Sequence, residues 1–271
     1  MPKSVFLFLI FCLGATVPSH AKNAKTGFLD RSLSLRGTTY KYQVFVPDNW
    51  SPRQKWPIIL FLHGSGERGD DGLLQTEVGL PRAVRLDRSR FPAIIVLPQC
   101  RKKFWWTDAP MDEVAIQALE AAQQEFHGDR QRTYLTGLSM GGYGTWHLAG
   151  KFPGRFAALV PICGGIIRPE ALRGQESFST KPYDEAVKKM GSGTPVWIFH
   201  GGADDTVPVT ESQNMAAAMN ALGGEVRYTE YPGVGHNSWD KAYAEPDLMT
   251  WLLYKSTAEK LSSESASSRK R

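Results

Sequence analysis

The chain has 271 residues, 42% hydrophobic and 11% aromatic, which suffices for one large domain with a substantial core. Its formal charge is +5, but the segment from Lys255 onward holds five Lys and Arg residues against two Glu, so the remainder is close to neutral. No cluster of Lys and Arg indicates a nucleic-acid partner, and the basic residues 269–271 are interpreted as a solvated tail.

The first 21 residues have the pattern of a secretory signal peptide. One Lys precedes an apolar run over residues 5–17, and Ser19 and Ala21 have the spacing expected for cleavage after Ala21. The run is short for a membrane span, so an uncleaved anchor is the less favoured alternative. We therefore expect an exported protein, secreted or periplasmic, with no integral membrane span after cleavage. The expected organisation is a signal peptide over 1–21, one domain over 22–260 and a disordered, Ser-rich basic tail over 261–271.

The following part of the chain alternates strand and helix patterns. A continuous apolar run such as 56–62 predicts a strand buried on both faces of a parallel sheet. Apolar residues at helical spacing over 111–127, followed by Gly128, predict a helix. Strands are expected over 28–40, 41–47, 56–62, 91–97, 133–136, 156–162, 195–199 and 225–231, and helices over 111–127, after residue 139, and over 183–190, 210–222 and 246–260. This alternation predicts a mainly parallel sheet with helices on both faces.

Ser139 lies in the sequence Gly137-Leu138-Ser139-Met140-Gly141, between a predicted strand and a predicted helix. This context is typical of a nucleophile elbow, where a strained turn lifts the serine hydroxyl above the sheet. The flanking glycines are needed where a Cβ would collide with the neighbouring strand and helix. The hydroxyl then lies at a helix N-terminus, which favours developing negative charge.

A glycine-rich loop over 63–72 follows the buried strand 56–62. Glycine at this density lets backbone N–H groups point into a common space, so the amides of Ser65 and Met140 could form an oxyanion hole. An ordinary tight loop is the alternative interpretation.

Three loops at carboxyl ends of predicted strands carry, in order, Ser139, Asp204 and His236. Acyl transfer needs a hydroxyl activated by an imidazole base, and a carboxylate that fixes the tautomer of that base. A single loop Asp or His is weak support, but their joint order on strand ends indicates a catalytic triad.

The motifs LFLHGSGERGDDG, LPQC followed by FWW, GLSMGGYGTW, PICGG, HGGADDTVPV and GHNSWDKAY resemble the secreted esterase branch of the α/β-hydrolases, over nearly the whole mature chain. This branch is similar to phospholipase/carboxylesterase, dienelactone hydrolase and feruloyl esterase families, whose members are often labelled predicted peptidases. The resemblance implies the α/β-hydrolase fold with a mainly parallel eight-stranded sheet. It also implies Ser139 as nucleophile, His236 as base, Asp204 as acid, with Asp205 as its rival, and the Ser65 and Met140 amides as oxyanion donors.

Trp105 and Trp106 follow a predicted central strand, in a loop. Ligands of open α/β sheets bind at the carboxyl edge, so these indoles could bind substrate. Packing over the domain rim is an equally good interpretation, because Trp is buried on average whatever its role.

Cys100 and Cys163 remain in the mature chain, and an exported pair invites a disulfide. The strand order implied by the resemblance separates them by three strand steps, or ~14 Å, whereas a disulfide tolerates only about 7 Å between Cα atoms. We expect two buried thiols.

The leading hypothesis is an exported serine esterase that acts on small esters or on acyl groups of polysaccharides, without cofactor or metal. A serine peptidase similar to the prolyl oligopeptidase catalytic domain is the first alternative, although this chain has no room for a propeller domain. A non-catalytic carbohydrate-binding or interaction module is the second alternative. The sequence does not determine the oligomeric state.

Overall fold

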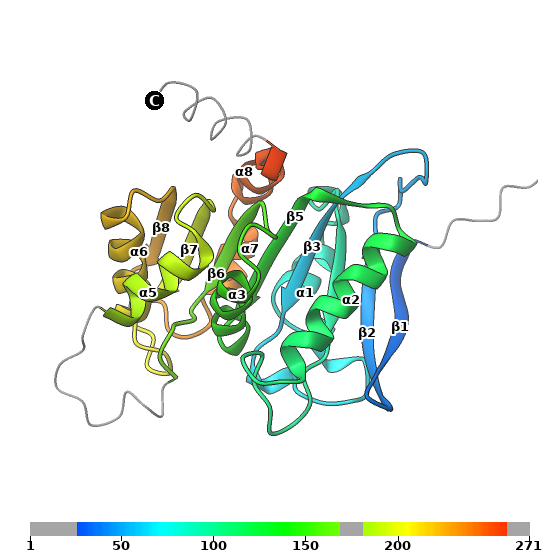
Figure 1. Cartoon of the computed structure of the whole chain (residues 1–271), viewed down its shortest axis with the longest axis horizontal. Helices are drawn as coiled ribbons and strands as arrows, with labels where there is room; N and C mark the ends of the chain where they lie inside the picture. The colour runs from blue at the N-terminus through cyan, green and yellow to red at the C-terminus, as the bar shows by residue number, and fades with distance from the viewer. Residues whose placement is uncertain (1–25, 169–180, 259–271) are drawn as a thin grey trace, which may run out of the picture.

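A computed structural model describes residues 26–168 and 181–258, which form an eight-stranded sheet with helices on both faces (Figure 1). The strand order is β1-β2-β4-β3-β5-β6-β7-β8. The strands are β1 (Gly27–Leu35), β2 (Thr38–Val46), β3 (Trp56–Leu62), β4 (Ile94–Pro98), β5 (Gly128–Leu138), β6 (Ala158–Ile162), β7 (Val196–Gly201) and β8 (Val226–Tyr231). The predicted eight-stranded sheet is confirmed.

The sheet is antiparallel only at one end. β2 runs antiparallel to both β1 and β4, whereas every other neighbouring pair is parallel. Because β3 to β8 run in one direction, the loops that follow them lie at one edge of the sheet. These loops carry the candidate residues from Ser65 to His236.

Helices cover the two faces of the sheet unequally (Figure 1). Apolar side chains of α2, α3, α5 and α6 join the core on one face, and those of α1, α7 and α8 join the core on the other. The helices are α1 (Leu80–Leu86), α2 (Met111–Glu125), α3 (Met140–Lys151), α5 (Lys181–Met190), α6 (Thr210–Ala221), α7 (Trp239–Ala244) and α8 (Leu248–Tyr254).

Strand β3 shows why the central strands read as continuous apolar runs. Ile58 and Leu60 pack into the core on one face of the sheet, while Ile59 and Phe61 pack into the core on the other. All four side chains are at most 1% exposed, and full burial of such a side chain contributes about 1.5–3 kcal/mol. A strand buried on both faces therefore favours apolar residues at successive positions.

Cys100 and Cys163 are both buried free thiols, as expected. Cys100 follows β4 and Cys163 follows β6, and three strand steps separate these strands in the sheet. The predicted absence of a disulfide between them is confirmed.

The chain beyond β8 differs from the predicted single helix over 246–260. α7 precedes Pro246, and α8 ends at Tyr254, after which Lys255 takes extended backbone. Proline lacks an N–H and disfavours helical backbone in the residue before it, so Pro246 separates the two helices. The short helix α1 has no counterpart among the predicted elements.

The predicted signal peptide and the predicted tail over 261–271 lie outside the described residues. Within the described ranges, none of the helices combines the length and apolar character needed to cross a bilayer.

Candidate active site

Ser139 lies in a sharp turn between β5 and α3. Its φ of 51° and ψ of −119° are in a region that favours glycine, so the serine is held in a strained conformation. Two glycines make this close packing possible. A Cβ on Gly137 would lie 2.3 Å from the carbonyl oxygen of Gly141, and a Cβ on Gly141 would lie 1.9 Å from that of Leu62. The turn therefore has the geometry that the sequence motif predicts.

His236 bridges Ser139 and Asp204. Its Nε2 lies 2.9 Å from the Ser139 Oγ, and its Nδ1 lies 2.7 Å from the Asp204 Oδ2. With the proton on Nδ1, the imidazole donates to the carboxylate and Nε2 is free to accept the hydroxyl proton. The His236 side chain is 21% exposed and the Asp204 side chain is fully buried. The structure thus brings together the three side chains that the chain order predicts.

The Asp204 carboxylate accepts hydrogen bonds at both oxygens. Oδ1 accepts from the backbone amides of Thr206 and Val207, each at 2.9 Å. Oδ2 accepts from His236 and lies 3.2 Å from the Nε2 of His200. Burial alone would raise the pKa of Asp204, but these four donors together hold it well below its usual range. A buried carboxylate that stays ionised is suited to orienting an imidazole and stabilising its protonated form.

Asp205 does not share this environment. It is exposed, and its Oδ1 accepts from the hydroxyl of Thr206 at 3.2 Å. The hydrogen bond from His236 reaches the carboxylate of Asp204 instead.

His200 is a member of this site that sequence reasoning missed. It is fully buried, and its Nδ1 lies 2.7 Å from the hydroxyl of Ser212. Its Nε2 lies 3.0 Å from the carbonyl of Val207 as well as near Asp204, so Nε2 must carry a proton and Ser212 donates to Nδ1. Its position four residues before Asp204, at the end of β7, was the available signal.

The two predicted oxyanion donors are the backbone amides of Ser65 and Met140. Met140 is the first residue of α3, and Ser65 begins the short 3₁₀ helix η1 (Ser65–Glu67), so each amide precedes the helical ladder. A Cβ on Gly64 would lie 3.7 Å from that of Ser139, which shows how closely the loop approaches the serine. The role of the Ser65 and Met140 amides as oxyanion donors remains a prediction.

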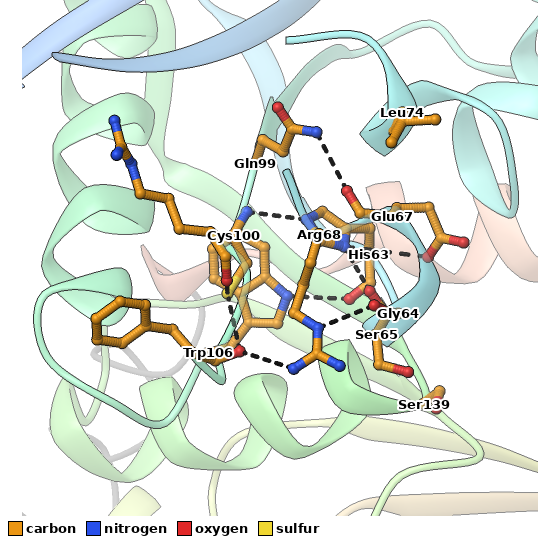
Figure 2. Close-up of polar contacts among 12 residues, drawn as sticks. His63, Gly64, Ser65, Glu67, Arg68, Leu74, Gln99, Cys100, Trp106 and Ser139 are labelled. Carbon is orange, nitrogen blue, oxygen red and sulfur yellow. Dashed lines mark hydrogen bonds and ion pairs between the residues drawn. The ribbon is translucent and has the colours of Figure 1, made fainter. Parts of the chain in front are cut away.

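The loop after β3 is held by side chains and backbone of the loop after β4 (Figure 2). The Nε2 of His63 accepts from the amide of Cys100 at 2.9 Å, so Nδ1 carries the proton and donates to the Gly64 carbonyl at 2.6 Å. The indole N–H of Trp106 donates to the His63 carbonyl at 2.9 Å. Burial lowers the pKa of His63 to about 4, which keeps this imidazole neutral.

The two adjacent tryptophans have different environments. Trp106 is fully buried, and its Cβ lies only 2.5 Å from where a Cβ on Gly144 would be, so it is a core residue and not a pocket wall. The prediction that it binds substrate is wrong, because its indole N–H is also committed to His63. Trp105 is half-buried, with its ring centroid 5.6 Å from that of Tyr143 and the Arg168 guanidinium 4.8 Å above it. Substrate binding by Trp105 stays a prediction.

A groove lies between α3 and α5. Its volume is about 720 Å³, and Tyr143, Gly165 and Arg168 are among the described residues that line it. Tyr143 is one helical turn beyond Ser139, whereas none of the three triad residues lines the groove.

Cys163 lies next to the triad. Its Sγ, an Asp204 oxygen and a His236 nitrogen all fall within 4.8 Å of one another, a separation that could suit a metal ion. Burial raises the pKa of the Cys163 thiol to about 12, however, and metals bind the thiolate. Since Asp204 and His236 are already hydrogen-bonded to each other, the hydrogen-bonded triad is the better description of this cluster.

The family model named Esterase matches residues 32–245. The chain belongs to the Esterase family. This Esterase-family chain is also 32% identical to a solved thermostable esterase, with a TM-score of 0.72, and the match covers 84% of this chain and 63% of that one. It is 24% identical over 244 residues to a protein of Aspergillus flavus named "Probable feruloyl esterase C", covering 88% of this chain and 83% of that protein.

An uncharacterized secreted protein of Arthroderma benhamiae is 23% identical to the Esterase-family chain over 207 residues, 67% of this chain and 21% of that protein. The chain thus spans about a fifth of this fungal relative and less than two thirds of the thermostable esterase. The resemblance to α/β-hydrolase esterases that the motifs indicate is confirmed at the level of the family and the fold.

Proposed function

We propose that the protein is a serine hydrolase that cleaves carboxylic esters through an acyl-enzyme intermediate. The observation that carries this proposal is the placement of His236, hydrogen-bonded to the Ser139 hydroxyl on one side and to the buried, ionised Asp204 on the other. Membership of the Esterase family supports the same reaction.

In the acylation step, the Nε2 of His236 takes the proton from the Ser139 hydroxyl as Oγ attacks the ester carbonyl. The carbonyl oxygen becomes negatively charged and would accept hydrogen bonds from the amides of Ser65 and Met140. His236 then returns the proton to the alkoxide oxygen of the leaving alcohol, so the C–O bond breaks and an acyl-serine remains.

In the second step, water replaces the alcohol. His236 removes a proton from the water as its oxygen attacks the acyl carbon, and the proton passes to Ser139 Oγ when the acyl–serine bond breaks. Asp204 stays ionised throughout and stabilises the imidazolium, because its pKa is held well below its usual range. The carboxylic acid is then released.

Replacing Ser139 with Ala tests this proposal. We expect kcat for p-nitrophenyl acetate to fall by about 10⁴-fold or more, because the covalent route is lost. A fluorophosphonate probe should label the wild-type protein on the peptide that contains Ser139, and should leave the variant unlabelled. A folded Ser139→Ala protein with near-normal turnover would rule out this mechanism.

The half-buried Trp105, whose ring packs against Tyr143 one helical turn from Ser139, supports substrates with a bulky or aromatic acyl group, such as the acyl groups of polysaccharides. Comparison of kcat/KM for p-nitrophenyl acetate, methyl ferulate, acetylated xylan and a chromogenic peptide tests the range of substrates. A preference for the peptide would contradict the assignment as an esterase.

We also propose that the protein is exported, on the basis of the leader pattern over residues 1–21 and of the secreted fungal relative. Mass spectrometry of the protein from a secreting host should find a mature N-terminus at Lys22. An intact leader on cell-bound protein would contradict cleavage.

A further inference from the structure

A second cavity borders the candidate oxyanion loop at Ser65 and Gly66. Its volume is about 380 Å³, and it is lined by Ser65, Gly66, Arg68, Lys102 and Lys103. We call it the basic recess. Among the described residues that line it, three are cations and none is an acid.

The positive charge of the recess is not neutralised by nearby carboxylates. In the described parts of the chain, no carboxylate oxygen lies within 4.0 Å of the charged nitrogens of Arg68, Lys102 or Lys103. Glu67 is the acid next to Arg68 in sequence, but its Oε2 points to the His63 imidazole, 4.0 Å from Nδ1. A cavity bordered by one sign of charge attracts ligands of the opposite sign.

Two backbone carbonyls hold the Arg68 side chain in place (Figure 2). Its Nε donates to the Ser65 carbonyl at 2.9 Å, and its Nη1 lies 3.4 Å from the Phe104 carbonyl. These contacts fix the guanidinium plane against the loop, while Nη2 makes no hydrogen bond to the described residues. A fixed guanidinium that still has free N–H groups is suited to a carboxylate.

The two lysines come from a turn of the neighbouring loop. The amide of Phe104 donates to the carbonyl of Arg101 at 3.2 Å, which closes a turn with Lys102 and Lys103 at its tip. Lys103 has a φ of 73°, an uncommon conformation for a residue other than glycine. Both side chains are exposed and border the same recess as Arg68.

The recess adjoins the reacting centre through Ser65. The amide of this residue is the predicted oxyanion donor, and the residue also lines the recess. The adjacent Gly64 closely approaches Ser139. A charged group bound in the recess would therefore be joined to the scissile ester by only a short chain.

The geometry points to a carboxylate-binding subsite: the basic recess holds a carboxylate of the substrate, and the preferred esters carry this group near the scissile bond. The inference rests on the proposed esterase function and names the substrate class of that site. The carboxylate can belong to the acyl part or to the alcohol part, and the test has one arm for each.

The first arm compares mono-p-nitrophenyl adipate with p-nitrophenyl hexanoate, two acyl groups of equal length that differ in the terminal charge. The second arm compares 4-acetoxybenzoate with 4-acetoxybenzamide, in which the charge lies on the leaving group. Each pair is measured on the wild type and on the double variant Lys102→Gln/Lys103→Gln, which keeps Arg68 and its hydrogen bonds to the loop.

We expect kcat/KM for the charged ester of at least one pair to fall about tenfold in the double variant, mainly through KM. Turnover of its uncharged counterpart should stay within about twofold. High salt should reduce the wild type's advantage on the charged ester in the same way, since exposed charges are screened.

The control is Arg53→Gln/Lys55→Gln, which removes the same charge from two exposed residues that precede β3, at the opposite edge of the sheet from the candidate site. It should leave both ester pairs within about twofold. Equal losses on charged and uncharged esters in the Lys102/Lys103 variant, or equal effects of the two double variants, would overturn the inference.

Failure of the inference differs from failure of the proposed function. If the uncharged esters are hydrolysed in a Ser139-dependent way and neither charged ester depends on the lysines, the recess is not a carboxylate subsite but the esterase stands. If the folded wild type hydrolyses none of the four esters, the proposed function fails, and the inference fails with it.

Discussion

The loop after β3 and the loop after β7 both belong to the candidate active site, but different kinds of group fix their backbones. Residues outside the first loop hold it: Cys100 donates to His63, Trp106 donates to its carbonyl, and the Gln99 amide donates to the Glu67 carbonyl at 3.2 Å. In the second loop, the Asp204 carboxylate accepts from two amides of its own loop, and the amides of Gly202 and Ala203 donate to carbonyls at and just after the end of β8.

In the loop after β3, the groups that fix the backbone differ from the group that is predicted to act in catalysis. In the loop after β7, one carboxylate has both roles. The side chains that fix the loop after β3 do not touch the reacting atoms, since the predicted contribution of that loop is a backbone amide. In the loop after β7, the same carboxylate orders the backbone and orients His236. Substitutions in the two loops should therefore have different signatures.

Asp204→Asn should have the largest effect. The change should lower kcat by about 10⁴-fold, because an amide does not fix the correct tautomer of His236. Steady-state kinetics with p-nitrophenyl acetate measure this loss. Asp205→Asn is the matched control, and its kcat should stay within a few-fold of the wild type. A larger loss in Asp205→Asn than in Asp204→Asn would show that Asp205, and not Asp204, is the acid of the triad.

His200→Phe should have an intermediate effect. It removes a buried donor to Asp204 while keeping a ring of similar size, so we expect kcat to fall about 10-fold to 100-fold with little change in KM. His200→Gln can still donate from its side-chain amide and should recover part of the loss. If both variants lose kcat and melting temperature equally, His200 is a packing residue and does not position Asp204.

The smallest effect concerns stability against acid, and it contrasts the two loops directly. The pKa of His63 is lowered to about 4 by burial, below its unfolded value, so the unfolded state binds more protons as the pH falls below about 6.5. The free energy of unfolding should therefore fall by about 2 kcal/mol between pH 7 and pH 5 through this residue.

Asp204 should contribute nothing to that change. Its pKa is depressed, so its stabilisation is present above the unfolded value near 4 and is lost only as the pH falls through the lower folded value. Urea unfolding at pH 7 and pH 5 compares the wild type with His63→Gln, in which the acid-induced loss should be smaller. The same loss in both proteins would show that other groups control acid sensitivity.

The sequence predicts those parts of the site that depend on local geometry. Gly137 and Gly141 mark the turn at Ser139, because no side chain fits where these glycines meet neighbouring backbone. The strand order that the family resemblance implies likewise predicts that Cys100 and Cys163 lie too far apart to pair, and the structure has this order. In both cases the information lies in a short motif or in the topology.

Other features depend on tertiary contacts that leave no local pattern. Trp105 and Trp106 are adjacent and chemically identical, and only the packing of Gly144 and the carbonyl of His63 determines that Trp106 is the buried one. His200 likewise reads as an ordinary strand-end histidine until β7 and α6 place Ser212 beside it. A sequence pattern shows only the type of such a residue, whereas its contacts and burial in the folded chain determine its role.

Each of the two loops, after β3 and after β7, has a buried cysteine beside it that a thiol reagent could modify. Cys100 adjoins the loop after β3, and Cys163 adjoins Asp204 and His236. Both are fully buried, and burial raises the pKa of each to about 12, so a thiol reagent can modify either one only while the surrounding structure is open. The labelling rate of each cysteine in the native protein therefore reports how often the structure around it opens. Comparison of the two rates shows which side of the active site opens more readily.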